Sequence, residues 1–172
     1  EAQNLTAIKN ASIDIVLCHW ALTLMDPITP VLKEVNRILS SGGKFAALVN
    51  GPMDTAPGYL DVYNLIYKYV QTKLPNYGKI DLGDPRIRST KSLEHLVGEV
   101  FPSAEISIEN NVVSLLGPVA EVSETAAGFF YASFILPTEL RIRMLSDLSN
   151  LLSVSKQEGR FVMPVSRLII KK

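Results

Sequence analysis

The feature that most constrains the fold is the stretch of residues 13–49, which carries the pattern of a strand, a helix and a second strand. Residues 13–18 are almost uninterruptedly apolar and rich in β-branched side chains. This is typical of a strand that is covered on both faces in a parallel sheet. A second apolar run, residues 44–49, follows the helical stretch. The pattern predicts a β-α-β unit and therefore an α/β fold.

The helix between these strands can start at either of two residues. Asp26 or Thr29 can act as its N-cap, because each is followed by a proline that suits the first turn. Apolar side chains then recur at helical spacing and form one stripe that would pack on the sheet. The stripe comprises Val31, Leu32, Val35, Ile38 and Leu39. Gly42 and Gly43 are predicted to end the helix, because glycine adopts the left-handed C-terminal conformation without a Cβ penalty.

The carboxyl ends of the two strands are the first candidates for a binding site. A helix that joins two strands favours a parallel pair with a right-handed crossover, and ligands bind outside the carboxyl ends of the strands in such sheets. Cys18, His19 and Trp20 end the first strand, and Asn50 ends the second. We expect Asn50 to begin a loop on the substrate side, over residues 50–58.

These elements resemble the fourth strand, the following helix and the fifth strand of class I S-adenosylmethionine-dependent methyltransferases. The usual family form is roughly F-D-x-V-x-S-x-x-x-L, followed by L-x-E-x-x-R-V-L-K-P-G-G. The matching positions are Asp14, Val16, Leu22, Leu32, Glu34, Arg37, Leu39, Gly42 and Gly43. The departures are Ser40 and Ser41 in place of Lys-Pro, and Thr23 where many members have histidine. Spacing, residue type and expected structure agree over about thirty positions.

The resemblance implies a partial Rossmann-like methyltransferase fold. Parallel strands 4 and 5 of that fold would be followed by an antiparallel C-terminal strand pair, with helices on the faces of the sheet. Residues 1–172 would then be the C-terminal part of a single methyltransferase domain. Residues 1–58 would end the cofactor-binding core, and residues 59–172 would supply the substrate-side helices and the last strands.

The family's cofactor signature, a glycine-rich turn after the first strand, has no counterpart in this sequence, since no Gly-x-Gly run occurs. An acidic residue that ends a second strand cannot be placed either. The opening residues Glu1-Ala2-Gln3-Asn4-Leu5 look like the acidic-Ala-x-x-Leu motif found just after the family's third strand. We therefore expect roughly the first half of the catalytic domain to be missing, and this chain to be inactive alone.

The resemblance implies S-adenosyl-L-methionine as the cofactor. The Glu1 carboxylate would lie near the exocyclic amine of adenine, and the Ala2 backbone amide near a ring nitrogen. Cys18, His19 and Trp20 would lie beside the methionine part. The implied reaction is methyl transfer to a small-molecule acceptor, and His19 is the best-placed titratable group for a general base.

Each of these residues also has a purely structural interpretation. His19 could be a strand-end histidine satisfied by backbone groups, and Trp20 could belong to the core. Cys18 has no basic neighbour except His19, which favours an inert buried thiol over a nucleophile. Glu34 and Arg37 lie three apart on one helix, where a surface ion pair explains them. One cysteine and two well-separated histidines give no metal-ligand spacing, so no metal is expected.

The remaining sequence predicts further helices and strands. Helices are expected at residues 59–74, 90–101, 118–136 and 138–154, strands at 104–109, 112–116 and 165–171, and a long loop at 75–89. Four aromatic residues cluster within the third helical segment, Phe129, Phe130, Tyr131 and Phe134. Such a cluster could cap an apolar substrate, with Phe130 and Tyr131 on the substrate side, or belong to the core.

The composition limits the classes of binding partner that this chain can have. The 17 basic and 17 acidic residues cancel, so no global field draws the chain to nucleic acid. No apolar run reaches the ~20 residues needed to span a bilayer. The single cysteine suits a reducing compartment such as the cytoplasm. We expect a small-molecule substrate, no nucleic-acid partner and no membrane span.

A non-catalytic assembly or regulatory module with the same fold is the competing interpretation. If the strand at residues 13–18 lacks its inner neighbour, it presents an unpaired edge and an uncovered apolar face. Such edges promote association. We therefore expect self-association through this edge of the sheet.

Overall fold

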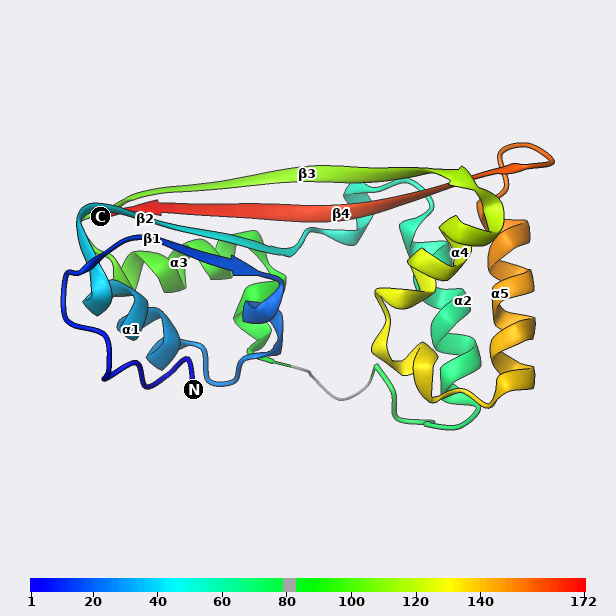
Figure 1. Cartoon of the computed structure of the whole chain (residues 1–172), viewed down its shortest axis with the longest axis horizontal. Coiled ribbons are helices and arrows are strands. Elements are labelled where there is room, and N and C mark those ends of the chain that lie inside the picture. The colour runs from blue at the N-terminus through cyan, green and yellow to red at the C-terminus, as the bar shows by residue number, and fades with distance from the viewer. Residues whose placement is uncertain (79–82) are drawn as a thin grey trace. The chain divides into compact units, whose positions relative to one another are not determined.

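The computed structural model describes residues 1–78 and 83–172 (Figure 1). Residues 79–82, which belong to the predicted loop at 75–89, lie outside the described residues. The described chain divides into two compact units. The first contains residues 1–52, 83–111 and 165–172, and the second contains residues 53–78 and 112–164.

Four strands form one sheet in the order β1-β2-β4-β3. They are β1 (Ile13–His19), β2 (Leu39–Asn50), β3 (Glu105–Pro118) and β4 (Glu158–Lys171). β1 and β2 are parallel and are joined by α1 (Thr29–Ile38), which confirms the predicted β-α-β unit. β4 is antiparallel to β2, with Asn50 opposite Val165. β3 and β4 point in opposite directions in Figure 1, so the expected mixture of parallel and antiparallel strands is confirmed.

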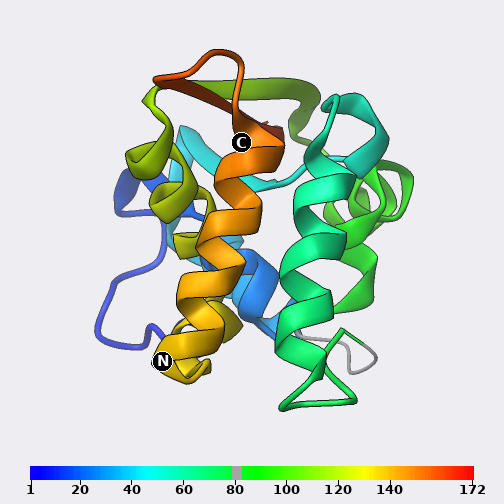
Figure 2. The same ribbon diagram turned by 90° about the vertical axis from the view of Figure 1, so that its right-hand side faces the viewer.

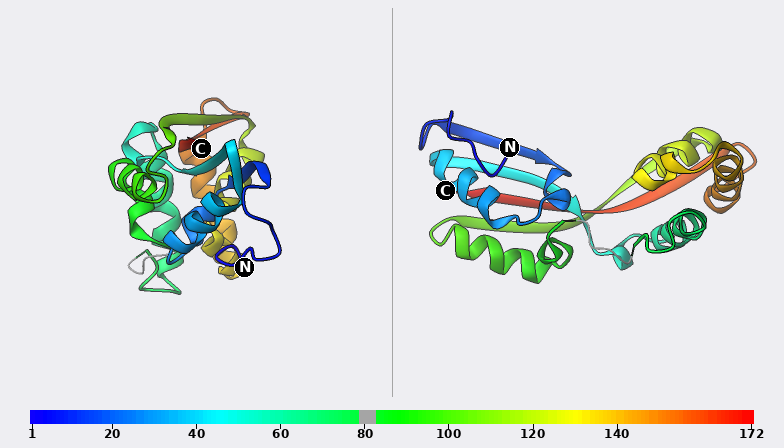
Figure 3. Two further views of the ribbon diagram at one scale, coloured as in Figure 1. Left: turned by 90° about the vertical axis from the view of Figure 1, so that its left-hand side faces the viewer. Right: turned by 90° about the horizontal axis from the view of Figure 1, so that it is seen from below.

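Two helices, α1 and α3 (Thr90–Val100), cover the same face of the sheet in the first unit (Figures 1 and 3). The predicted stripe of α1 is buried against this face, because its side chains recur at the helical period. Its partners in the core come from α3, β2 and β4. The core includes Val31, Leu32, Val35, Leu39, Phe45, Leu93, Leu96, Val97, Leu168 and Ile170.

The opposite face of β1 is open, so the expectation that this strand is covered on both faces is wrong. Val16 and Cys18 pack against the helix-covered core. Ile15 and Leu17 point to the other face and are 63% and 76% exposed. The reason is that both helices of the first unit lie on one side of the sheet (Figure 3). β1 is also the edge strand, with β2 as its only strand neighbour among the described residues.

The two glycines do not end the helix as predicted. α1 ends at Ile38, and Leu39 is already extended, so β2 begins there. Gly42 and Gly43 lie inside β2, beside an irregularity in its register with β1. Gly42 has φ 76°, and a Cβ on Gly43 would lie 2.9 Å from the Ser40 carbonyl oxygen. The glycines therefore permit a bend and a close approach within the strand.

The second unit is built around three helices (Figure 2). They are α2 (Tyr59–Gln71), α4 (Val119–Gly128) and α5 (Thr138–Leu152). α5 packs against both α2 and α4. The predicted helical segment at 118–136 is interrupted at Phe129, and a 3-10 turn, Tyr131–Ile135, follows it. The two short strands expected at 104–109 and 112–116 are one continuous strand, β3.

Shorter 3-10 helices lie at Ala21–Leu24, Met53–Thr55 and Pro85–Arg88. In the part of the chain that the structure describes, no helix has both the length and the apolar character needed to cross a bilayer.

Candidate functional site

The structure brings the residues at the carboxyl ends of β1 and β2 together. The parallel register places His19 opposite Leu48, which lies two residues before the end of β2. The Trp20 indole N–H then donates a hydrogen bond to the side-chain oxygen of Asn50, at 2.7 Å. This bond connects the two strand ends that the β-α-β pattern predicts as neighbours.

The backbone of Trp20 is held in an unusual conformation. Its φ is 57°, in the left-handed region, which costs about 1–2 kcal/mol for a residue with a Cβ. Three of its shorter hydrogen bonds offset this cost. The Trp20 N–H donates to the Leu48 carbonyl at 3.0 Å, and the Thr23 hydroxyl donates to the Trp20 carbonyl at 2.6 Å. The third is the indole bond to Asn50. The indole is therefore fixed in place before any ligand arrives.

His19 and Cys18 lie beside this indole with different accessibility. The His19 imidazole is exposed and meets the Trp20 ring edge to face, with 4.8 Å between ring centroids. Cys18 is half-buried and packs against the core. Burial raises the pKa of its thiol, although hydrogen bonds from the Leu22 and Ala21 backbone act in the opposite direction. The thiol is therefore mainly protonated at neutral pH, which is unfavourable for a nucleophile.

Glu1 and Ala2 lie in the same unit as the strand ends. The exposed Glu1 carboxylate accepts a hydrogen bond from the Gln3 side-chain amide at 2.9 Å. The Glu1 carbonyl accepts from the Asn4 N–H at 3.0 Å, which closes a tight turn. Ala2 is half-buried and packs on the core of the first unit. The turn therefore presents a carboxylate to solvent while a small side chain anchors it.

A brace that sequence reasoning missed supports the segment after Trp20. The Asp84 N–H donates to the Met25 carbonyl at 2.9 Å. The buried Asp84 carboxylate accepts from the Arg86 guanidinium at 2.7 and 2.9 Å and from the Ile28 N–H at 3.5 Å. These bonds, first those from the Arg86 side chain, lower the pKa of Asp84 to about 2. The only sequence signal is an Asp-Pro pair, which is typical of a helix N-cap and says nothing about its distant partner.

The substrate-side candidates Phe130 and Tyr131 belong to the second unit. Phe130 is buried and stacks on Tyr59, with 6.3 Å between ring centroids. It also meets Tyr63 and Tyr67 edge to face. Tyr131, by contrast, is 73% exposed. The aromatic cluster therefore divides: Phe130 is core of the second unit, and Tyr131 is available at its surface.

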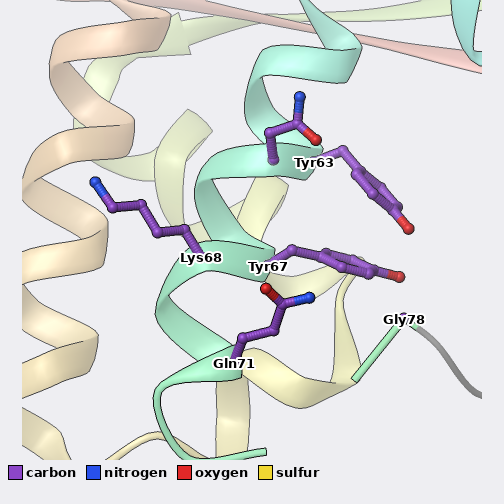
Figure 4. A pocket seen from close by; sticks show the side chains of 6 residues that line it. Tyr63, Tyr67, Lys68, Gln71 and Gly78 are labelled. Atoms are coloured by element: carbon purple, nitrogen blue, oxygen red, sulfur yellow. The ribbon is translucent and has the colours of Figure 1, made fainter. Parts of the chain in front are cut away.

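The second unit also has an open hollow of about 400 Å³ on α2 (Figure 4). It is lined by Tyr63, Asn64, Tyr67, Lys68, Gln71 and Gly78. The Tyr63 and Tyr67 rings stack at 3.8 Å, and Figure 4 shows Lys68 pointing away from their hydroxyls. Burial and the Tyr63 hydroxyl raise the pKa of Tyr67. The polar groups of this hollow do not converge on one point, so it is a weaker candidate than the strand ends.

Residues 1–78 and 83–172 contain no group of three His, Cys, Asp or Glu side chains that could hold a metal ion. The side chains at the strand ends are the indole of Trp20, the imidazole of His19, the thiol of Cys18 and the amide of Asn50.

Comparisons with known proteins agree with the resemblance in the sequence. Residues 1–47 match the family model described as a methyltransferase domain. No curated protein matches the chain. The matched residues include β1, α1 and the first nine residues of β2, and hence most of the elements that form the candidate site.

Several solved structures share the fold. The YcgJ protein from Bacillus subtilis is 12% identical, with a TM-score of 0.54, and the match covers 99% of this chain and 68% of that one. A putative methyltransferase from Bacillus halodurans is 13% identical, with a TM-score of 0.55 and coverages of 100% and 75%. A putative methyltransferase of an antibiotic biosynthesis pathway from Anabaena variabilis is 14% identical, with a TM-score of 0.55 and coverages of 99% and 70%. These likenesses confirm the fold.

Proposed function

We propose that this chain, with its methyltransferase fold and methyltransferase-domain N-terminal segment, is part of an enzyme that transfers a methyl group from S-adenosylmethionine to a small molecule. The observation that carries the proposal is the family match over residues 1–47. The same residues build the strand end at which Trp20 is fixed against the end of β2. Ligands bind at such strand ends in open α/β sheets.

The residues present fit one side of this cofactor. The Glu1 carboxylate can accept from the exocyclic amine of adenine, and the Ala2 backbone is held on the core beside it. Trp20 offers a fixed aromatic face near the methionine part, with His19 and Cys18 adjacent. S-adenosylmethionine supplies a methyl group that its sulfonium already activates. The task of these side chains is alignment, which can remove much of the barrier.

The sequence contains no Gly-x-Gly run that could approach the methionine part of the cofactor. We therefore assign the activity to a longer protein that also carries such a turn, and expect this chain alone to be inactive. Calorimetric titration with S-adenosylhomocysteine tests this. We expect heat of binding for a version extended to its natural N-terminus and none for the 172-residue chain. Absence of binding to both would contradict the proposal.

His19 is the proposed general base, for acceptors that hold their proton at the working pH. Its imidazole is exposed at the end of β1, next to the fixed Trp20 ring. Replacing His19 by alanine in the extended protein should lower turnover by about 100-fold or more, the usual contribution of a general base. His95 is the matched control, because it is an exposed histidine on α3 that lies 3.4 Å from Glu99. Equal turnover in His19→Ala and His95→Ala would remove His19 from the mechanism.

A second proposal concerns association, and it rests on the exposed edge of β1. Ile15 and Leu17 leave an apolar surface on an edge strand whose outer backbone groups have no strand partner among residues 1–78 and 83–172. We expect the 172-residue chain to self-associate through this edge, and Leu17→Lys to reduce that association because charge at an edge opposes pairing. Sedimentation over a range of concentrations measures it, with Leu60→Lys as a control on α2. A monomer at all concentrations would contradict the proposal.

A further inference from the structure

One ion pair on α1 makes contacts far beyond those of a surface pair. The Arg37 guanidinium donates two hydrogen bonds to the Glu34 carboxylate, both at 2.8 Å. It also donates to the backbone carbonyls of Leu5 and Ile8, each at 2.9 Å, and to the Asn10 side chain at 2.6 Å. The helix is thereby bonded to the N-terminal segment at three points along it.

Glu34 completes this attachment from the other side. Its carboxylate accepts the Leu5 backbone N–H at 2.7 Å, while Arg37 holds the Leu5 carbonyl. Both polar groups of one peptide residue are therefore bound by one ion pair. Hydrogen bonds from Arg37, and then from Leu5, lower the pKa of Glu34 to about 2, so the carboxylate stays charged at neutral pH. Charge-assisted bonds of this kind are the stronger ones in proteins.

The residue held in this way lies directly after the turn that carries the proposed adenine contacts. The Asn4 N–H bonds to the Glu1 carbonyl, so Leu5 follows the closing residue of the turn. Ala2 packs on the core, but the Glu1 side chain is exposed, and its hydrogen bond among the described residues is to Gln3 within the turn. Leu5 and Ala2 are therefore two points at which the turn that carries Glu1 is attached to the rest of the first unit.

We infer that Glu34 and Arg37 are positioning residues for the adenine side of the cofactor site, acting through Leu5 on Glu1 and Ala2. This inference rests on the proposed function. An ordinary ion pair on the helix surface would need only the Glu34–Arg37 contact itself. Arg37 instead donates five hydrogen bonds, one from each N–H of its guanidinium group. Three of these five bonds reach the segment at residues 5–10, which a surface ion pair would not explain.

The first part of the test uses the 172-residue chain and needs no ligand. Arg37→Gln should raise the hydrogen-exchange rate of the Leu5 amide by about tenfold or more, because the amide loses a partner held by the ion pair. Lys33→Gln is the matched control, since Lys33 is an exposed cation on the same helix. Equal exchange of Leu5 in both variants would overturn the inference.

The second part uses the version extended to its natural N-terminus, with S-adenosylhomocysteine and free adenosine as probes. Arg37→Gln should raise the dissociation constants of both probes by the same factor, about tenfold, because only the adenine side of the site is displaced. Arg37→Lys should not restore affinity, since a lysine lacks the planar fork that reaches several acceptors. A loss for S-adenosylhomocysteine without a loss for adenosine would overturn the inference, because the substitution would then act on the methionine side of the site and not on the adenine side.

Two further outcomes separate this inference from the proposed function. If the unsubstituted extended protein binds neither probe, the proposed function fails and the positioning role fails with it. If it binds both and Arg37→Gln leaves both affinities unchanged, only the positioning role fails. Should Arg37→Gln not fold, Glu34→Gln is the second variant. This substitution keeps an acceptor for the Leu5 N–H but removes the ion pair. It should raise the dissociation constants of both probes by a smaller factor than Arg37→Gln does.

Discussion

Replacing Gly83 by alanine is expected to lower the free energy of unfolding by about 3 kcal/mol or more. Gly83 has φ 72°, and in this left-handed region a Cβ costs about 1–2 kcal/mol. The added Cβ would also lie 2.2 Å from the Thr23 carbonyl oxygen, which is backbone and cannot rotate away. Forcing atoms apart in a packed site typically costs a further 1–3 kcal/mol or so.

Gly42→Ala is the matched control for this prediction. Gly42 has φ 76°, but nothing lies within 4 Å of the position that its Cβ would take. Gly42→Ala should therefore lower the free energy of unfolding only by the cost of the left-handed conformation, about 1–2 kcal/mol. Urea unfolding followed by the fluorescence of Trp20, the single tryptophan and a residue of the first unit, measures both. Equal losses in the two variants would show that the segment at Thr23 is not packed against Gly83.

Asp84→Ala is expected to lower the free energy of unfolding by about 2–3 kcal/mol at pH 7, because several hydrogen bonds to a buried carboxylate disappear together. The pKa of Asp84 is lowered from 3.8 to about 2, so its stabilising contribution is present above about pH 4. It is lost as the pH falls through 2. The difference between the variant and the unsubstituted chain should therefore be constant from pH 7 to 5 and shrink below pH 4.

Urea midpoints between pH 7 and pH 2.5, again followed through Trp20, test this pH dependence. Asp54→Ala is the control, because Asp54 is an exposed carboxylate in the second unit. A difference that persists unchanged at pH 2.5 would mean that the Asp84 carboxylate is not the stabilising species. Gly83→Ala and Asp84→Ala both act on contacts with the segment after Trp20, so they also probe how firmly the candidate site is supported.

The sequence predicts the β-α-β unit because its signals are local. The apolar stripe of α1 and the two β-branched runs each specify an element from neighbouring residues, and the parallel pairing then follows from the crossover. The neighbourhood of Trp20 and Asn50 follows from the same argument, since both stand at carboxyl ends of adjacent strands. The family resemblance adds the cofactor to this local argument.

Three features depend on distant residues and could not be predicted. The open face of β1 reflects which side of the sheet the helices occupy, and no residue within the strand specifies that. The Asp84 brace joins residues 56 positions apart. Glu34 and Arg37 match the family pattern, yet their partner Leu5 lies 29 and 32 positions away. Their spacing on the helix therefore predicts only a surface ion pair. The prediction that Gly42 and Gly43 end the helix was wrong because a helix end and a bend in a strand both favour glycine.

Fluorescence titration of Trp20 with S-adenosylhomocysteine tests the central claim most directly. Trp20 is the single tryptophan, and its indole is fixed by Asn50 at the strand ends. In the version extended to its natural N-terminus, we predict a saturable change in tryptophan emission that Trp20→Phe abolishes, with the same dissociation constant as calorimetry. Binding by calorimetry with no change in Trp20 emission would contradict the claim that the carboxyl ends of β1 and β2 form the cofactor site.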